Sequence, residues 1–221
     1  MENILARSNM VKGQLQTCGI DSQNITDIIT QVKREDFVPD EYRDTAYVDG
    51  DIPLGRGRYI VSPFVFSSLL TEAKLFPSDK VLIIAGNLGY SAAVISQLAS
   101  HVTTVEQRPD LVNKARQNLK NFDNVEVVTA PLTAGYPNHQ PYDVIIIEAI
   151  IEHIPDDILS QLAEGGSVVT IKKHLSRAGS DNGAGTILHL GRQGSKYLEV
   201  DGDEINAPIL SEFNKKPVFK L

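Results

Sequence analysis

The sequence is poor in several features that would mark particular classes of protein. It contains one cysteine, Cys18, no tryptophan, and no apolar stretch as long as a membrane span. One cysteine excludes an internal disulfide and suits a reducing compartment, and the thiol itself is expected to be a small buried hydrophobe. Because the N-terminus MENILARSNM also lacks a signal-peptide h-region, the sequence predicts a cytoplasmic protein with no membrane partner.

Basic charge is scarce as well. The formal net charge is -7 and the isoelectric point is near 5.2. The densest basic spots are only dipeptides, Lys172–Lys173 and Lys215–Lys216. Neutralising nucleic-acid phosphates requires clustered lysine and arginine, so the sequence predicts no nucleic-acid partner. A chain of 221 residues that is 42% apolar can form one α/β domain with modest additions.

The most informative stretch is VLIIAGNLGY, Val81–Tyr90. The apolar run at Lys80–Ala85 predicts a buried strand, and a glycine-containing turn then leads into a helix. The next apolar run, Val102–Val105, predicts a second strand that ends at Glu106. This order is typical of a nucleotide-binding βαβ unit, in which the helix N-terminus faces the polar part of a cofactor and the carboxylate binds the ribose hydroxyls.

The turn departs from the full glycine fingerprint, which has three glycines at alternate positions. Those positions hold Ala85, Asn87 and Gly89. Asn87 can adopt the left-handed conformation that glycine otherwise supplies. Two alternatives stay open: Gly89 can serve only a tight turn and close packing, and Glu106 can cap the next helix, which begins near Pro109, instead of binding a ribose.

From Lys80 onward, apolar strand patterns alternate with helical ones. This alternation predicts an α/β fold with a doubly wound, mostly parallel sheet. The expected strands are Val81–Ala85, Val102–Glu106, Val125–Thr129, Val144–Glu148 and Ser167–Ile171, and the expected helices are Ser91–Ala99, Pro109–Asn121 and Pro155–Ala163. Gly185–Leu190 and Lys196–Val200 are expected to form an antiparallel hairpin at the sheet edge.

The regions outside this alternation are assigned by helical spacing and by turn residues. Helices are expected at Ile4–Cys18, at Asp21–Val32 and from Ser62-Pro63 to about Leu75. Residues 1–79 are therefore predicted to be a helical N-terminal extension with a loop that covers the substrate and cofactor. Residues 80–221 are predicted to be the core with its C-terminal hairpin, in one compact domain overall. The loop Ser176–Gly185 is the best candidate for a mobile segment.

Two further groups of residues are candidates for a site. Gly55 and Gly57 flank Arg56 in a loop that can close over a substrate or form a plain turn, and Arg56 or Arg58 can pair with a carboxylate. Glu148 ends a predicted strand at the carboxyl edge of the sheet, where ligands bind in such folds.

Glu148, Glu152 and His153 resemble a metal cluster but fit a solvated helix start. No metal is predicted, and the other histidines, which are scattered in the sequence, receive no role.

An ordered set of motifs between Asn9 and Lys173 resembles the protein-L-isoaspartate O-methyltransferase family, most closely a divergent bacterial branch. The motifs are Met10–Leu15, Phe37-Val38-Pro39, Ala46–Asp49, Pro53–Gly57 with Pro63, Gly89–Val94, Val105-Glu106, Tyr142–Ile146 and Gln161–Gly166. The P-L-G-x-G loop upstream of a Rossmann-like core is the most specific part of the set.

The resemblance implies a Rossmann-like methyltransferase fold, S-adenosylmethionine (SAM) as cofactor, an isoaspartyl carboxylate of a protein or peptide as acceptor, and a role in protein repair. It places the cofactor at Ala85, Gly86, Asn87, Gly89, Tyr90, Glu106, Gln107 and Glu148, and the acceptor at Arg56, Gly57, Val61 and Ser62. An acceptor carboxylate is already ionised at neutral pH. Alignment of the reactants, worth about 7–11 kcal/mol, therefore suffices without a histidine or cysteine signature.

The chain also departs from the family. The family's acidic residue for the methionine amine of SAM aligns with Ile83, and its first two glycines align with Ala85 and Asn87. Its acidic residue near the adenine aligns with Pro131, and its substrate-side serine aligns with Val61. These departures keep an alternative open: a catalytically impaired pseudoenzyme that binds a ligand or a protein. An NAD(P)-dependent oxidoreductase is a weaker alternative, because no substrate domain with a proton donor is evident. The oligomeric state is left open.

Overall fold

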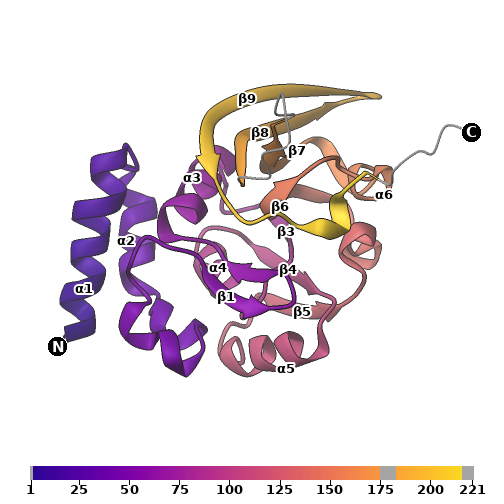
Figure 1. Cartoon of the computed structure of the whole chain (residues 1–221). Coiled ribbons are helices and arrows are strands. Elements are labelled where there is room, and N and C mark those ends of the chain that lie inside the picture. The colour runs from indigo at the N-terminus through magenta and orange to yellow at the C-terminus, as the bar shows by residue number, and fades with distance from the viewer. Residues whose placement is uncertain (1, 175–182, 216–221) are drawn as a thin grey trace, which may run out of the picture.

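The computed structural model describes residues 2–174 and 183–215. Its centre is a seven-stranded sheet in the order β5-β4-β3-β6-β7-β8-β9, seen from one side in Figure 1. The strands are β3 Lys80–Ile84, β4 His101–Glu106, β5 Val125–Thr129, β6 Tyr142–Ile151, β7 Leu162–Lys173, β8 Ala184–Gln193 and β9 Lys196–Asn206. The first five strands pair in parallel, and β8 and β9 add an antiparallel hairpin, which confirms the predicted fold class.

Helical elements cover both faces of this sheet, and each face carries its own apolar core. The α-helices are α1 Glu2–Met10, α2 Gln23–Gln31, α3 Pro63–Ala73, α4 Tyr90–Ile95, α5 Pro109–Asn118 and α6 Asp156–Leu159. One core joins the N-terminal helices, α3, α4 and α5 to the sheet through residues such as Ile83 and Ile146. The other joins α6 and the short helix η7, Ser211–Phe213, to the sheet through Leu82 and Ile147.

The segment before the sheet forms a two-stranded hairpin and a capped helix. β1, Ile52–Gly55, pairs antiparallel with β2, Arg58–Ile60, so the P-L-G-R-G loop is a hairpin turn. The chain then enters α3, whose N-cap is Ser62: its hydroxyl accepts a hydrogen bond from the N–H of Val65. Proline at the first helical position completes the predicted helix start.

The predicted helix over Pro155–Ala163 is wrong beyond its first turn. α6 ends at Leu159, and Leu162 already pairs with Tyr142 as the first residue of β7. The Gln161 side chain explains the early end, because its amide donates to the carbonyls of Ala134 and Asp157 and so holds the chain extended into the strand.

The expected burial of Cys18 is also wrong, since its side chain is exposed. The α-helix ends at Met10, and the chain continues as a π turn over Val11–Leu15 and a 3-10 turn over Gln16–Cys18. Regular α-helical spacing therefore does not extend to position 18. The left-handed Gly19 that follows confirms the predicted end of the helical segment.

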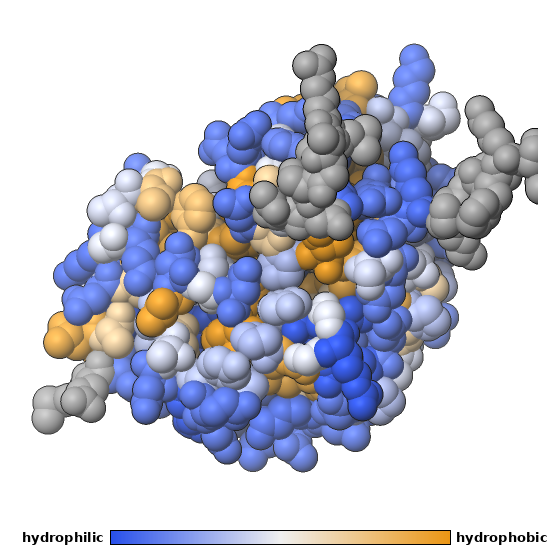
Figure 2. Space-filling model, in the orientation of Figure 1, coloured by the Kyte–Doolittle hydropathy of each residue, from blue (hydrophilic) through white to orange (hydrophobic). Residues whose placement is uncertain are grey.

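Figure 2 shows that polar side chains cover most of one face, with apolar ones between them, both over the N-terminal helices and near the centre of the view. Ile4 and Leu5 in α1 are among the exposed apolar residues of the N-terminal helices. Within the described residues, no helix is both long and apolar enough to cross a membrane. The predicted mobile loop Ser176–Gly185 lies mostly outside the described residues, as does the chain from Lys216 onward.

Candidate functional site

The predicted cofactor residues meet at the carboxyl edge of β3, β4 and β6. The turn from Ala85 to Gly89 follows β3, Glu106 ends β4, and Glu148 lies near the end of β6. β3 pairs with β4 on one side and with β6 on the other, so the connections leave it in opposite directions. This switch point is where open α/β sheets bind ligands.

The turn after β3 keeps a glycine-like backbone with only part of the glycine content. Ala85, Asn87 and Gly89 have φ angles of 62°, 51° and 94°, which confirms the left-handed conformation predicted for Asn87. A Cβ on Gly89 would lie 2.5 Å from Cδ1 of Leu119. Both the φ angle and the close packing at Gly89 therefore favour glycine. This agrees with the alternative that Gly89 serves a tight turn and close packing.

Gly86 is required by a close approach to the neighbouring strand. A Cβ at this position would lie 1.8 Å from the hydroxyl oxygen of Thr104. Such a distance is far below van der Waals contact, so a side chain at position 86 would force Thr104 or the turn to shift. Asn87 fixes the other side of the turn, because its amide donates to the carbonyl of Tyr59 in β2 at 2.9 Å.

Glu106 is buried, and its carboxylate is already hydrogen-bonded within the protein. Its Oε1 accepts the backbone N–H groups of Gln107 at 2.8 Å and Arg108 at 3.0 Å, just before α5. Arg58 places its Nε 3.3–3.4 Å from both oxygens. Glu106 therefore binds the backbone that leads into α5, but the first turn of α5 itself has no side-chain cap among the described residues. The ribose role of Glu106 stays a prediction.

Arg58 is the centre of a buried ion-pair network. Its two terminal nitrogens bind Glu212 of η7 in a bidentate pair at 2.8 and 3.2 Å, while its Nε faces Glu106. Burial opposes the charge of Arg58, but the carboxylates of Glu212 and Glu106 outweigh it and raise the pKa of its guanidinium. Burial likewise opposes the charge of Glu212, and Arg58 outweighs it, which lowers the pKa of that carboxyl.

Two neighbours tie this network to the hairpin and to α5. Gln107, a predicted cofactor residue, donates its amide to Glu212 at 2.6 Å. Arg108 donates to the carbonyls of Leu54 and Gly55 in β1. The β1–β2 hairpin, the end of β4 and η7 are thus held together by charged hydrogen bonds across the predicted nucleoside position.

A second buried cluster surrounds Arg34, which sequence reasoning did not single out. Arg34 lies in the 3-10 turn Arg34–Phe37, is fully buried, and donates to the carbonyls of Ala46 and Val61 at 2.9 and 2.7 Å. Its guanidinium carbon lies 4.8 Å from the centre of the Tyr90 ring. Burial lowers the pKa of Arg34. Tyr90, also a predicted cofactor residue, packs edge-on against Phe66.

Unpartnered polar atoms mark a small cavity beside Arg34. Arg34 Nη1, Asn87 Oδ1 and Glu148 Oε1 are buried and have no hydrogen-bond partner among the described residues. All three residues line the cavity, whose volume is about 10 Å³, enough for about one water molecule. Burial raises the pKa of Glu148 to about 7, opposed by the Ser91 hydroxyl and Arg34.

The predicted acceptor residues are separated by the hairpin. Arg56 and Gly57 lie exposed at its tip with φ angles of 52° and 72°. Val61 is buried and lines the small cavity, and Ser62 is occupied as the cap of α3. Of the two arginines expected to pair with a carboxylate, Arg58 does so, but with the protein's own carboxylates.

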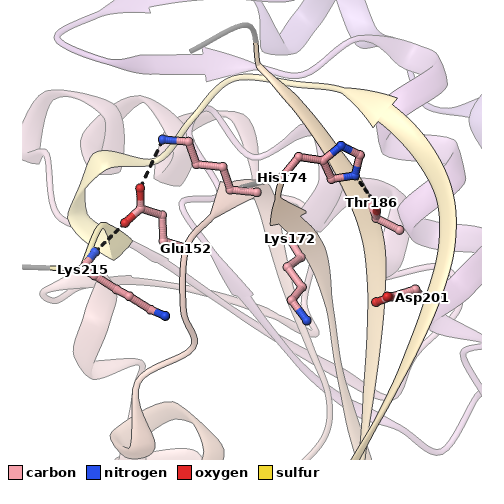
Figure 3. Close-up of a pocket in the computed structure, with 7 residues that line it drawn as sticks. Glu152, Lys172, His174, Thr186, Asp201 and Lys215 are labelled. Atoms are coloured by element: carbon pink, nitrogen blue, oxygen red, sulfur yellow. Dashed lines mark hydrogen bonds and ion pairs between the residues drawn. The ribbon is translucent and has the colours of Figure 1, made fainter. Parts of the chain in front are cut away.

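Glu148, Glu152 and His153 do not converge on one point. Glu152 pairs with Lys173 at 3.1 Å, and the ring of His153 contacts the carbonyl of Phe213. The solvated helix start expected there is wrong, because α6 begins only at Asp156. Glu152 instead lines a wider cavity of about 640 Å³ between the ends of β7, β8 and the C-terminal segment, drawn in Figure 3.

Several polar side chains around this wider cavity have partners within the protein. Lys172 pairs with Glu199 at 2.6 Å, and His174 contacts the hydroxyl of Thr186. Figure 3 shows Glu152 bridging a lysine side chain and the backbone of Lys215. This cavity holds none of the residues predicted to bind a cofactor or an acceptor.

The residues at the switch point do not fit a bound nucleoside cofactor in the arrangement described. The carboxylate of Glu106 is already paired with Arg58, and the cavity beside the turn has a volume of about 10 Å³. Sites for ligands of the size of SAM have volumes on the order of several hundred Å³. A cofactor would therefore need the hairpin or η7 to move first.

Glu212 and Arg34 are the main residues of the site that sequence reasoning missed. Glu212 lies 154 positions from Arg58, in a C-terminal stretch without a recognisable motif. Arg34 precedes the F-V-P motif, but a charged residue at a helix end gives no sign of burial. Only the tertiary structure brings these side chains to the turn.

Comparisons with known proteins point to one family. A family model described as Protein-L-isoaspartate(D-aspartate) O-methyltransferase matches residues 6–177. A protein-L-isoaspartate O-methyltransferase of Methanoculleus marisnigri is 34% identical over 165 residues, which cover 74% of this chain and 75% of the relative.

Two solved structures share the fold with a TM-score of 0.76 each. One is a protein-L-isoaspartate O-methyltransferase that is 24% identical, and the match covers 92% of this chain but 65% of that one. The other, from Plasmodium falciparum, is described as a protein-L-isoaspartate O-methyltransferase in complex with S-adenosyl-L-homocysteine. It is 16% identical, and the match covers 93% of this chain and 98% of that one.

Proposed function

Because the chain belongs to the protein-L-isoaspartate(D-aspartate) O-methyltransferase family, we propose that it methylates the free carboxylate of isoaspartyl residues in proteins. Membership confirms the predicted class of activity and SAM as the predicted cofactor. The comparisons give no support to the pseudoenzyme alternative. A role in repairing proteins of the cytoplasm is part of this proposal.

The observation that carries the proposal is the position of Glu106. It ends β4 directly beside the left-handed turn after β3, at the switch point of the sheet, where a carboxylate can accept hydrogen bonds from ribose hydroxyls. We assign nucleoside binding to Glu106 and Gln107. When bound, SAM supplies an activated methyl group on a sulfonium.

We interpret the arrangement of these side chains as a closed form of the proposed site. Arg58 is bound bidentately by Glu212 and more loosely by Glu106. Glu106 retains its two backbone N–H donors if Arg58 leaves. Movement of Arg58 and Glu212 together would therefore free Glu106, keep the Arg58–Glu212 ion pair and leave Glu106 its two backbone hydrogen bonds.

Arg56 is the residue best placed to meet the acceptor carboxylate. It is exposed at the tip of the β1–β2 hairpin and forms no hydrogen bond or ion pair with the described residues, whereas the hydroxyl of Ser62 is engaged in capping. Val61 offers no side-chain donor. Arginine binds carboxylates through paired N–H groups, which gives both orientation and charge complementarity.

Calorimetric titration with SAM and S-adenosylhomocysteine tests the cofactor assignment. We expect saturable binding by the wild type, and Glu106→Gln should weaken it at least 10-fold, because a glutamine side chain accepts fewer and weaker hydrogen bonds than a carboxylate. The matched control is Glu204→Gln, which makes the same change at an exposed acid of β9 and should leave the affinity unchanged. The absence of binding by the wild type at millimolar ligand would refute the assignment.

Transfer of labelled methyl groups from SAM to an isoaspartyl peptide tests the acceptor side. We expect low wild-type turnover, a gain for Val61→Ser through its new hydroxyl donor, and a loss of at least 10-fold for Arg56→Gln. Turnover that both substitutions leave unchanged would show that the hairpin does not contact the acceptor. An aspartyl peptide of the same sequence is the control substrate.

A further inference from the structure

Three side chains with metal-binding atoms converge at the opposite edge of the sheet from the turn. They are His101, the first residue of β4, Glu126 in β5, and His139 in the 3-10 turn Pro137–His139. One ligand atom from each lies within 4.8 Å of the others. Sequence reasoning gave these histidines no role, because they lie far apart in the chain and only the fold brings them together.

The sheet places two of these side chains on the same face. Thr103 of β4 is the register partner of Glu126, and His101 lies two residues before Thr103, so its side chain points to the same side. The rings of His101 and His139 then meet edge to face with their centres 5.8 Å apart. The parallel register thus fixes His101 and Glu126, and the 3-10 turn Pro137–His139 brings His139 against them.

His139 is held by its neighbours in an orientation suited to metal binding. Its Nδ1 lies 3.2 Å from the hydroxyl of Thr103, and its Nε2 lies 3.5 Å from Oε2 of Glu126. The Tyr136 ring packs edge-on against it, with centres 5.0 Å apart. Ligating histidines commonly use one nitrogen for such an outer hydrogen bond and present the other to the metal.

We propose that His101, Glu126 and His139 form a binding site for a divalent transition-metal ion, with Zn²⁺ as the expected occupant. Two imidazoles and one carboxylate are a ligand set that zinc uses, with a water molecule completing the tetrahedron. Mg²⁺ and Ca²⁺ prefer sets made only of oxygen and are disfavoured here. The Glu126 side chain is 46% exposed and that of His139 is 31% exposed, so an ion can enter from solvent.

Occupation requires only a small closure of the site. Metal–ligand bonds of about 2.0–2.2 Å place tetrahedral ligands about 3.4 Å apart. The pair formed by His139 and Glu126 is already at 3.5 Å. The ligand atoms all lie within 4.8 Å of one another, so His101 must approach by at most roughly 1.4 Å to reach this tetrahedral spacing.

This site would be structural and not part of the methyl-transfer chemistry. β4 is six residues long, so His101 lies roughly 16 Å along the strand from Glu106 at its other end. A bound ion would link β4, β5 and the turn that carries His139. Metal binding to the folded state alone should therefore raise the melting temperature.

Tag-free protein titrated with Zn²⁺ in a calorimeter tests the proposal. We expect one saturable site, weakened at least 10-fold by His101→Ala and by His139→Ala. Thr103→Val, which removes the outer hydrogen bond, should weaken binding by roughly 10-fold. Cys18→Ser and His189→Ala are controls that remove an exposed thiol and a distant imidazole, and should leave the affinity unchanged.

Co²⁺ supplies a spectroscopic signal that appears only if these residues bind a metal ion, and not if they only pack against one another. Tetrahedral Co²⁺ bound by the wild type should show intense visible absorption, which should disappear with His139→Ala while far-UV circular dichroism stays unchanged. The proposal is overturned if Zn²⁺ fails to bind saturably at about 1 mM, or if the double variant His101→Ala/His139→Ala keeps wild-type affinity.

Discussion

Two buried clusters of charge at the carboxyl edge of the sheet differ in how completely their polar atoms are paired. Around Arg58, both carboxylates and the guanidinium are engaged with one another or with backbone N–H groups. Around Arg34, by contrast, Arg34 Nη1, Asn87 Oδ1 and Glu148 Oε1 have no partner among the described residues. A ligand must displace protein groups from the first cluster, whereas the second offers free hydrogen-bonding atoms around a cavity of about 10 Å³, the size of one water molecule.

The two clusters also differ in which segments of the fold they join. Arg34 joins three segments of one region, since it donates to Ala46 and Val61 and stacks on Tyr90. Arg58 joins the hairpin to the distant C-terminal turn through Glu212. We therefore expect the Arg34 cluster to contribute mainly to stability and the Arg58 cluster mainly to access.

Arg34→Ala should have the largest effect on stability. It leaves the carbonyls of Ala46 and Val61 without their donor, removes the positive charge beside Glu148, and opens a cavity. Breaking a buried charged network in this way costs about 3–5 kcal/mol. Urea unfolding at pH 7 measures the change in the free energy of unfolding.

The matched control for Arg34 is Arg43→Ala, which removes an exposed arginine paired with Asp36. Exposed pairs contribute little, so we expect a change within about 0.5 kcal/mol. A loss below about 1 kcal/mol for Arg34→Ala, far under the cost of breaking a buried network, would contradict the stabilising role given to its cluster.

Arg58→Gln should lower stability and improve access to the nucleoside position. It leaves Glu106 and Glu212 without their shared cation, at a cost of about 3 kcal/mol. It also frees the Glu106 carboxylate, so S-adenosylhomocysteine should bind at least 10-fold more tightly. Urea unfolding and calorimetric titration measure the two effects on the same preparation.

Arg56→Gln is the control for this variant, because it lies two residues away at the exposed tip of the same hairpin. It should change neither stability nor cofactor affinity. Equal or weaker cofactor binding by Arg58→Gln, in protein that remains folded, would show that Arg58 does not close the site.

Glu148→Gln should reveal a pH-dependent cost in the Arg34 cluster. Burial raises the pKa of Glu148 to about 7 in the folded protein, against about 4.3 for an unfolded glutamate. Between these values the folded state binds more protons than the unfolded state, so this group lowers stability as the pH rises. The full cost, roughly 2–4 kcal/mol, is reached above about pH 7 and vanishes below about pH 4.

The glutamine variant lacks this titration and should therefore be more stable than the wild type at pH 8, with the difference shrinking toward pH 5. Urea unfolding of both proteins across this pH range measures the difference, in which other groups cancel. A difference that does not vary with pH would show that Glu148 titrates normally.

The sequence predicted the parallel strands well, because each is a short apolar run bounded by turn residues. It also predicted the position of Glu106 and the left-handed Asn87, since both follow from local pattern. It could not predict the pairing of Arg58 with Glu106 and Glu212, which lie 48 and 154 positions away. Pairing between charges so far apart in the sequence depends on tertiary packing and leaves no signature in the local sequence.

The errors in secondary structure have a similar origin. The helix expected over Pro155–Ala163 gave way to β7 because Gln161 bonds to Ala134, a contact 27 positions away. The exposure of Cys18 follows from π and 3-10 turns that replace regular helix. In both cases a local preference was overridden by a structure that helical spacing does not encode.

Ser62→Ala should have the smallest effect and shows whether the two clusters are coupled. Ser62 directly follows Val61, whose carbonyl binds Arg34, and β2 with Arg58 lies just before it. Loss of its hydrogen bond to the N–H of Val65 should cost about 1 kcal/mol, as for other N-caps. Ser62→Thr keeps the hydroxyl and should restore most of that stability. If Ser62 acts only as a cap, methyl transfer to an isoaspartyl peptide should be unchanged in both variants once each is fully folded. Activity lost in Ser62→Ala and recovered in Ser62→Thr would instead place this hydroxyl at the acceptor, and would transfer to it the role proposed for Arg56.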